Sequence, residues 1–456
     1  MPTPPPTAPP AVAPDDHRAW LDLLAGDGAA DVLGAALAAD GAELESWTLR
    51  QVHARPGAEV TVAFEVVARR AEGGVRRAHE HLFASTAPAS TFRRARGEDL
   101  PVGSDPGPGV VRLDDGGRSL HVWRHPHDPA LPGLEAGSTP ALVQERLREA
   151  GADVAVLGLE TVTYRPLRRA VLRARTSAGT VYVKVVRPSR VGELVERHAL
   201  FAGAPAGVHA PPVLGWSPDG VVLLAEVPGA SVADLVAWTP AVGQAGCIDP
   251  AEILRVAQGL PAAGRRLPRR APWADRLDRY LGTLASLHGM EPGRLEHLGA
   301  RVAAVVATRD PGPVVTTHGD LHAANLLLDP ADHLAVHAAD DPADHLADEP
   351  GGARTTPRVG GVLDVDTLGP GHLVDDLACA VAHLAVLTAI EPRLYAGTEG
   401  LVARCLDVFG RAADPALLRA RAAAVVVSLA AGADDAVRAD AFLHVAERLA
   451  ADATGI

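Results

Sequence analysis

Hydrophobic side chains follow different spacings along this chain, and the changes in spacing divide it into stretches. Residues 15–40 repeat apolar side chains at helical intervals. Residues 46–125 instead hold short apolar runs separated by Gly and Asp turns, which is typical of strands. The turn-forming composition of residues 131–138 predicts a linker, and from Val232 onward helical spacing dominates. Strands first and helices later predict an α+β chain with two lobes.

A second set of strands follows the expected linker. It is introduced by a helix with Thr139 at the N-cap and Pro140 at the first helical position. The first strand set contains Arg55-Pro56 and the second Arg165-Pro166, and each continues as a long strand, a Gly turn and another strand. This similarity predicts a weak internal repeat. Two unrelated antiparallel hairpins are an equal alternative.

Composition narrows the classes of function. The 456 residues are 47% hydrophobic but only 4% aromatic, so Ala, Val and Leu must fill the core. The net charge is −13 and no basic stripe is present, which argues against nucleic acid as a partner. Three cysteines, Cys247, Cys379 and Cys405, show no metal-ligand spacing, as expected for a reducing cytoplasm.

The beginning of the chain and its apolar runs bear on location. Residues 1–14 are rich in Pro, Ala and Thr and lack the basic and apolar regions of a signal peptide, so they predict a disordered tail. No uncharged apolar run approaches the ~20 residues that cross a bilayer. The longest, residues 422–431, fits a buried helix. The patterns predict a cytoplasmic protein without membrane contact.

One lysine stands out. Lys184 is the single lysine among 43 basic Lys and Arg residues, and it lies within the apolar run 181–186. A compact ammonium group on an interior strand needs an anionic partner, which a nucleotide phosphate would supply. Chance survival in a lysine-poor chain is an equal alternative when this residue is considered alone.

Two further segments carry chemistry. Residues 314–328 present Asp320 and Asn325 in a short loop between apolar strands, and Asp364 ends another apolar strand. A carboxylate in such a loop can orient a hydroxyl for attack, while amide and carboxylate oxygens suit Mg²⁺. Together with a lysine for phosphates, these residue types are the components of phosphoryl transfer.

Residues 329–360 are polar and rich in Asp and His. The sequence of residues 329–335 recurs twelve residues later as residues 341–347. We interpret this duplication as an insertion in a tolerant surface loop rather than as a metal-binding loop.

At this point a family resemblance is clear. Residues 318–325, His-Gly-Asp-Leu-His-Ala-Ala-Asn, resemble the catalytic loop of the aminoglycoside phosphotransferase and choline kinase group, which are small-molecule kinases with a protein-kinase-like fold. Residues 363–366, followed by Asp376, are similar to the metal-binding strand and next helix of that group. The resemblance covers about residues 140–456. It implies a small antiparallel-sheet lobe at 139–229 and a helical lobe at 230–456. Residues 15–135 predict an α/β domain before them, and the weak repeat makes a degenerate copy of the small lobe one alternative for it.

The resemblance also implies roles for matching residues. Asp320 would be the catalytic base, Asn325 and Asp364 the Mg²⁺ ligands, and Lys184 the contact to the ATP phosphates. Glu196 would be the helix partner of Lys184, with Glu193 as its competitor. Glu226 and Val227 would form the hinge beside adenine. His318 and Asp376 would support the loop. Asp366 has three open roles, in substrate binding, metal binding or loop solvation.

Two segments depart from the family pattern. Residues 164–169 stand where a Gly-rich phosphate loop is expected, and their arginines either contact phosphate or form an exposed strand edge, the second being favoured. The insert 238–273 either shapes a substrate pocket or is a solvated loop.

The resulting hypothesis is an ATP- and Mg²⁺-dependent kinase acting on a hydroxyl of a small molecule. The small molecule that accepts the phosphate would be an aminoglycoside, amino sugar, sugar or amino alcohol. The alternative is a nucleotide-binding pseudokinase or scaffold without turnover. The acceptor, any link to antibiotic resistance, the role of residues 15–135 and the oligomeric state do not follow from the sequence.

Overall fold

The computed structural model separates into two compact units. The first comprises Met1–Val195 and Val213–Glu226, and the second comprises Glu196–Pro212 and Val227–Ile456. The predicted separation of residues 15–135 from the small lobe stays a prediction, because both lie in the first unit. The structure describes residues 14–53, 59–70, 76–97, 109–115, 118–202, 207–238, 248–330 and 357–454. The expected tail and most of the duplicated insert therefore lie outside the described residues.

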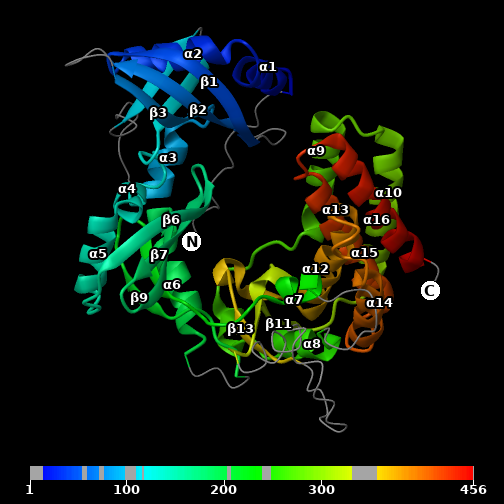
Figure 1. Cartoon of the computed structure of the whole chain (residues 1–456). Helices are drawn as coiled ribbons and strands as arrows, with labels where there is room; N and C mark the ends of the chain where they lie inside the picture. The colour runs from blue at the N-terminus through cyan, green and yellow to red at the C-terminus, as the bar shows by residue number, and fades with distance from the viewer. Residues whose placement is uncertain are drawn as a thin grey trace, which may run out of the picture. The chain divides into compact units, whose positions relative to one another are not determined.

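The first unit contains two five-stranded antiparallel sheets (Figure 1). The order in the first sheet is β1-β2-β3-β5-β4 and in the second β6-β7-β8-β10-β9, so the two orders are equivalent. The strands of the first sheet are β1 (Ala42–His53), β2 (Thr61–Arg70), β3 (Arg76–Ser85), β4 (Val110–Asp115) and β5 (Arg118–Arg124). Those of the second are β6 (Val156–Arg165), β7 (Arg169–Thr176), β8 (Gly179–Val186), β9 (Val213–Trp216) and β10 (Val221–Ala225).

The helices of the two sheets also correspond. A helix pair precedes each sheet and packs on the same face of it, and a further helix follows the third strand. In the first copy these are α1 (Pro14–Ala25), α2 (Ala29–Ala38) and α3 (Ala89–Arg96); in the second they are α4 (Leu134–Ser138), α5 (Pro140–Glu149) and α6 (Val191–Ala199). A shared order of strands and helices supports the predicted duplication over two unrelated hairpins.

The third strands show how the two copies differ. Ser85 of β3 pairs with the first residue of β2, and Val186 of β8 pairs with the first residue of β7, so the strand ends correspond. Two residues earlier, Phe83 therefore occupies the position that Lys184 has in the second copy. Neighbouring side chains alternate between faces, and both positions lie opposite the face covered by the helix pair. The first copy thus carries an aromatic ring in place of the ammonium group.

The prediction of a linker at residues 131–138 is wrong. Leu131 is fully buried and Leu134 is 1% exposed, and both join the core of the second sheet together with α4. The two leucines are spaced by three residues and so share one side of a helical turn. Their burial outweighs the turn-forming composition that suggested a linker.

The second unit is mostly helical and encloses two short antiparallel pairs of strands. Strand β11 (Val314–Thr317) pairs with β14 (Gly369–His372), and β12 (Leu326–Leu328) pairs with β13 (Val359–Val362). The helices around them are α7 (Val232–Trp238), α8 (Pro250–Gln258), α9 (Leu277–Leu287), α10 (Pro292–Thr308), α12 (Leu373–Ala385), α13 (Leu387–Ile390), α14 (Thr398–Phe409), α15 (Pro415–Ala430) and α16 (Ala436–Thr454).

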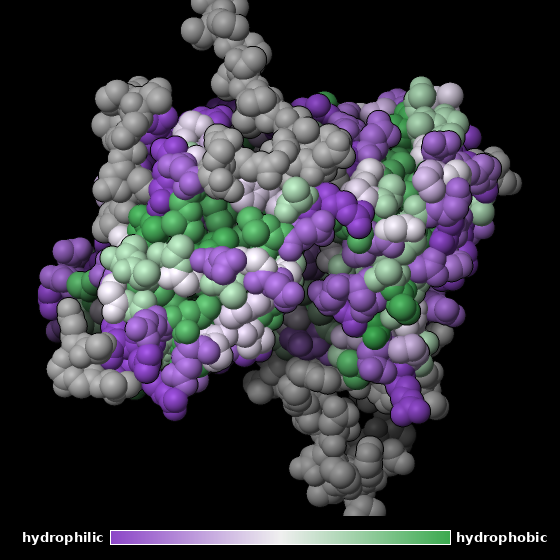
Figure 2. Space-filling view, turned by 90° about the horizontal axis from the view of Figure 1, so that it is seen from above, coloured by the Kyte–Doolittle hydropathy of each residue, from purple (hydrophilic) through white to green (hydrophobic). Residues whose placement is uncertain are grey.

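Small apolar side chains allow the central helices of this unit to pack closely. Helix α15 buries Ala and Val on most of its circumference, which confirms the buried helix predicted around residues 422–431. In the described chain, one apolar stretch, Leu373–Ile390, has the length and composition of a membrane span; 56% of it is buried within the fold. Hydrophilic and apolar side chains mix on the surface face shown in Figure 2.

The backbone at residues 229–231 holds strand β12. Leu328 N–H donates to the Ala230 carbonyl at 2.9 Å, and Ser231 forms a bridge with Leu327. Gly229 has φ = +125°, and a Cβ atom there would lie 2.2 Å from the Leu328 carbonyl oxygen. Only glycine fits this close approach of two backbones.

We predict that Gly229→Ala lowers the free energy of unfolding by about 2 kcal/mol or more, because it combines left-handed strain with a backbone clash. Gly282→Ala is the matched control, because that glycine lies within helix α9 and its Cβ would meet nothing within 4 Å. The control should be neutral or stabilising by up to ~1 kcal/mol. Urea unfolding measures both. Equal stability of the two variants would contradict the prediction.

Candidate functional site

The loop at residues 318–325 is fixed from the beginning of helix α12. Asp376 of this helix is 1% exposed, and its two carboxylate oxygens accept hydrogen bonds from the backbone N–H groups of His318 and Gly319, at 2.7 and 2.8 Å. Gly319 has φ = +80°, and a Cβ atom there would lie 2.9 Å from Oγ1 of Thr367. The start of the loop therefore has a single conformation set by one carboxylate.

Burial controls the electrostatics of this anchor. Desolvation raises the pKa of Asp376 to about 7, although the two backbone donors favour the charged form. The charges of Asp375 and Asp320 also raise it. Asp375 is paired with Arg421. These contacts support the predicted role of Asp376 in holding the loop.

His318 is fully buried and lies between two parts of the site. Its Nε2 donates to the carbonyl oxygen of Leu363 at 2.8 Å, and its own carbonyl accepts from Oγ1 of Thr367 at 2.6 Å. Burial lowers the pKa of His318, so its imidazole is neutral. A neutral ring enclosed in this way joins the loop to residues 363–367, which supports the predicted structural role.

Asn325 closes the other end of the loop. Its amide nitrogen donates to the Asp320 carbonyl at 2.9 Å and lies 3.1 Å from Nε2 of His322. Both side-chain hydrogen bonds use the nitrogen, so the amide oxygen remains available as a ligand. The Asn325 carbonyl accepts from Leu363 N–H at 2.9 Å, which brings Asn325 beside the segment that contains Asp364.

Asp364 has a left-handed backbone, with φ = 53° and ψ = 50°. This conformation is costly for a residue other than glycine, and Asp tolerates it better than most. The turn ends strand β13 and starts the short helix at residues 365–367. An amide oxygen from Asn325 and a carboxylate from Asp364 form the hard oxygen set that Mg²⁺ prefers, so these residues fit that ion.

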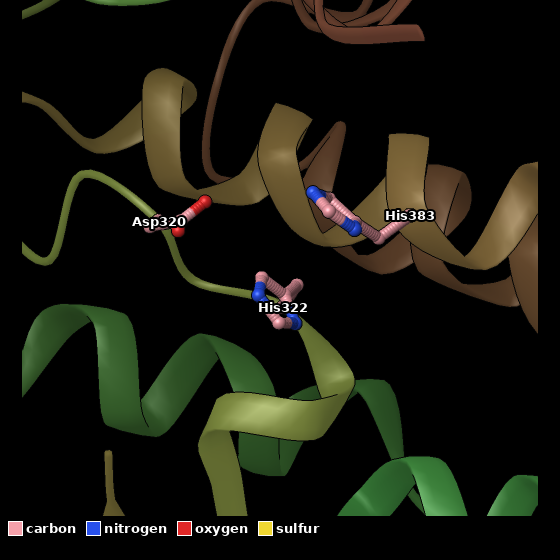
Figure 3. Close-up of side chains that lie close together, drawn as sticks. All are labelled: Asp320, His322 and His383. Carbon is pink, nitrogen blue, oxygen red and sulfur yellow. The ribbon is translucent and has the colours of Figure 1, made fainter. Parts of the chain in front are cut away.

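A second group of ligand-type atoms lies beside the loop. One ligand atom each of Asp320, His322 and His383 lies within 4.8 Å of the others. Figure 3 shows Asp320 and His322 on the loop and His383 on helix α12. The two imidazole rings are stacked, with centroids 4.3 Å apart and planes inclined by 19°. His383 had no motif to indicate it, since it lies on an apolar helix far from the loop in the sequence.

Other residues near Asp320 were also missed. Cys379 is buried on α12, and its Sγ donates to Oδ1 of Asp320 at 3.8 Å; burial raises the pKa of this thiol. Desolvation and the charge of Arg276 lower the pKa of Arg270. The charges of Asp320 and Asp366 oppose this effect without reversing it, which shows that both carboxylates lie close to Arg270. Asp366 therefore keeps its three open roles, now with a cation near it.

The candidate nucleotide-binding residues are divided between the units. Lys184 is 5% exposed on β8, between Val171 of β7 and Val222 of β10. Glu226 follows β10 in the first unit, whereas Glu196 and Val227 belong to the second. Their predicted common site, and the pairing of Glu196 with Lys184, stay predictions. Glu193, the competitor, forms an ion pair with Arg190 at 2.8 Å.

The two departures from the family pattern have structure of their own. In the turn between β6 and β7, Leu167 is buried with φ = 62°, while Arg168 forms an ion pair with Glu59 at 3.3 Å. The ion pair fits a place for the Arg168 side chain at an exposed strand edge better than a contact of this guanidinium group with phosphate. In the insert, α8 buries Ile253 and Val256 in the core, so this helix is not a solvated loop, whereas most of residues 262–271 are exposed.

Comparison with known proteins identifies part of the chain. Residues 167–336 match the phosphotransferase enzyme family. This match spans both the Lys184 strand and the loop with Asp320 and Asn325. The match supports the family resemblance over these residues, and the predicted α+β chain, with antiparallel sheets first and helices after them, is confirmed. The matched family is one of phosphotransferase enzymes. No curated protein matches the chain.

Solved structures similar to this chain include three phosphotransferases. Macrolide 2′-phosphotransferase of Brachybacterium faecium is 18% identical, covers 67% of this chain and 97% of its own, and has a TM-score of 0.35. An aminoglycoside phosphotransferase of Streptomyces rimosus is 22% identical, with 66% and 97% covered and a TM-score of 0.33. A choline kinase of Streptococcus pneumoniae is 11% identical, with 68% and 98% covered and a TM-score of 0.43.

The buried imidazole of His383 predicts a pH dependence of stability. Burial, and secondarily His322, lower its pKa from 6.5 to about 3. Between these values the unfolded chain binds a proton that the folded protein does not, so this contribution to stability is full above about pH 6.5 and declines as the pH falls toward 3. His383→Phe should therefore lose less stability than the wild type between about pH 7 and about pH 5.

Thermal unfolding in the presence of a chelator measures this difference. His297→Phe is the control, because His297 is exposed on α10 and should leave the pH dependence unchanged. A His383→Phe profile that runs parallel to the wild type would contradict the assignment of a neutral, buried ring.

Proposed function

We propose that this phosphotransferase moves the γ-phosphate of ATP, with Mg²⁺, to a hydroxyl group of a small molecule. The observation that carries the proposal is the shared anchoring of three groups. Asp320 follows two residues fixed by Asp376, Asn325 donates to the Asp320 backbone, and Asn325 is bonded to the strand end before Asp364. The proposed base and the two proposed metal ligands thus lie in two neighbouring segments that are joined by hydrogen bonds.

The Asp320 carboxylate is the group that receives the proton. The acceptor oxygen attacks the γ-phosphorus, the new P–O bond forms as the bond to the bridging oxygen of ADP breaks, and the hydroxyl proton passes to Asp320. Mg²⁺, held by Asn325 and Asp364, would neutralise phosphate charge when bound. His318 and Asp376 hold the loop, so the carboxylate need not reorganise during the reaction.

The second sheet and the segment directly after it would supply nucleotide contacts. The single ammonium group of Lys184 is buried on an interior strand, where a phosphate partner would compensate its desolvation. Glu226 and Val227 follow β10 and would present backbone groups to adenine. The two described cysteines, Cys379 and Cys405, are buried and form no disulfide within the described residues, which supports the proposed cytoplasmic location.

The test is ADP release with Mg²⁺-ATP and a panel of aminoglycosides, macrolides, sugars, choline and amino alcohols. We expect turnover on one class and a loss of about 10²-fold or more in Asp320→Ala, since positioned bases contribute 10²–10⁴-fold. Asp310→Ala is the control: Asp310 is exposed and accepts one backbone hydrogen bond from Gly312 at 2.9 Å. Turnover of Asp320→Ala within twofold of the wild type would contradict the assignment of Asp320 as the catalytic base. ATP binding without turnover on any acceptor would favour the pseudokinase alternative.

A further inference from the structure

Asp320, His322 and His383 form a ligand set unlike the one suited to Mg²⁺. Two imidazoles and one carboxylate are the donors found around Zn²⁺ and other first-row transition metals. Metal–nitrogen distances near 2.1 Å place tetrahedral ligand atoms about 3.4 Å apart. The three ligand atoms already lie within 4.8 Å of one another. The two imidazoles are stacked, so at least one ring has to turn before both nitrogen lone pairs, which lie in the ring planes, point at one ion.

The state of His383 favours a ligand. In the described part of the chain its ring makes no hydrogen bond, and it is stacked on His322. Nothing in the proposed transfer mechanism uses this side chain, although it lies beside the catalytic carboxylate.

We propose that Asp320, His322 and His383 bind a transition-metal ion of the Zn²⁺ type, at a site distinct from Asn325 and Asp364. Binding at Asp320 withholds the carboxylate from the acceptor hydroxyl. The site therefore inhibits phosphate transfer when the metal is bound. The inhibitory consequence rests on the proposed function, whereas metal binding itself does not.

Co²⁺ is the probe for binding, because its visible absorption reports a low-coordinate nitrogen and oxygen site. We expect the untagged wild type to bind Co²⁺ with this absorption, and Zn²⁺ to displace it. His383→Phe keeps a stacked ring but removes the ligand, and should weaken Co²⁺ binding by about tenfold or more, since even outer partners of metal ligands affect affinity 10–100-fold. His297→Phe, at an exposed position on α10, should bind as the wild type does.

Inhibition is measured separately, with Zn²⁺ added to the Mg²⁺-ATP reaction. His383→Phe should keep basal turnover within about twofold and lose most of the inhibition by Zn²⁺. Unchanged Co²⁺ binding in His383→Phe overturns the metal site. Binding that depends on His383 in a protein without turnover leaves the site standing and removes only the proposed function and its inhibition.

A separate observation concerns the turn between β6 and β7. Asp128, which follows the first sheet, is 3% exposed and accepts hydrogen bonds from Tyr164 Oη and the Leu167 N–H, both at 2.7 Å, and from Ala130 N–H at 2.8 Å. The Leu167 carbonyl accepts from Nε of Arg187 at 2.7 Å. The left-handed Leu167 is thus held through its N–H, its carbonyl and its buried side chain, as strained residues at functional sites often are.

Aromatic rings of the first sheet complete this contact. Tyr164 meets Phe83 edge-on, with centroids 5.0 Å apart, and its hydroxyl accepts from Nε1 of Trp123 at 3.3 Å. Phe83 is the residue that corresponds to Lys184 in the duplicated fold. The turn itself lies toward the Lys184 end of the second sheet, because Val171, shortly after it, pairs with Lys184.

We infer that the N-terminal sheet positions this turn for nucleotide binding, with Asp128 and Tyr164 as positioning residues. In the second sheet this face carries Lys184. In the first sheet the same face carries aromatic rings, which pack against Tyr164 of the turn. This inference rests on the proposed function, because it assigns the turn to the phosphate end of the ATP site.

Tyr164→Phe tests the inference, since it keeps the ring and removes only the hydroxyl. We expect the KM for ATP to rise several-fold, with kcat and the KM for the acceptor within about twofold, and calorimetry without acceptor should show the same loss of ATP affinity. Tyr395→Phe, in the second unit, should change none of these values. Unchanged ATP affinity in both Tyr164→Phe and Asp128→Asn overturns the inference. A wild type that binds no ATP overturns the proposed function instead.

Discussion

The site depends on one buried carboxylate. Asp376 accepts the two backbone N–H groups that begin the loop, and without it these donors would be buried and unpaired, which typically costs 1–3 kcal/mol each. With its start fixed in this way, the loop presents Asp320, and the side chain of Asn325 closes its other end. Asp376 itself is held by helix α12, which buries small apolar side chains in the core of the second unit.

The duplicated architecture separates two uses of one sheet. Both copies bury one face under a helix pair, so each keeps an independent apolar core. The opposite faces have diverged: one holds Lys184 and the other Phe83, with Phe92 and Trp123 around it. Burial of aromatic rings against a neighbouring sheet stabilises the fold. Burial of a lysine ammonium group is instead costly unless an anion compensates its charge.

The sequence predicted those parts of the site that lie in one short segment or directly after a strand. Asp320 and Asn325 are five residues apart in a loop, and strand alternation placed Lys184 on an interior strand. His383 and Asp128 could not be found in this way, because their roles arise from contacts between distant segments, such as the hydrogen bond from Leu167 to Asp128. The expected linker failed for the same reason, since Leu131 is buried only because the second sheet folds against it.

The shared core around Leu167 also bears on how the chain can be divided. Ala63, Phe83 and Trp123 from the first sheet, together with Phe92 of α3, enclose Leu167 from the second, so the boundary near residue 139 passes beside a common apolar cluster. A fragment that began there would expose Leu167 and the ring of Tyr164, and the loss of Asp128 would leave the Tyr164 hydroxyl and the Leu167 N–H without their acceptor. The small lobe is therefore a dependent part of the fold, and its solubility is a property of the longer chain.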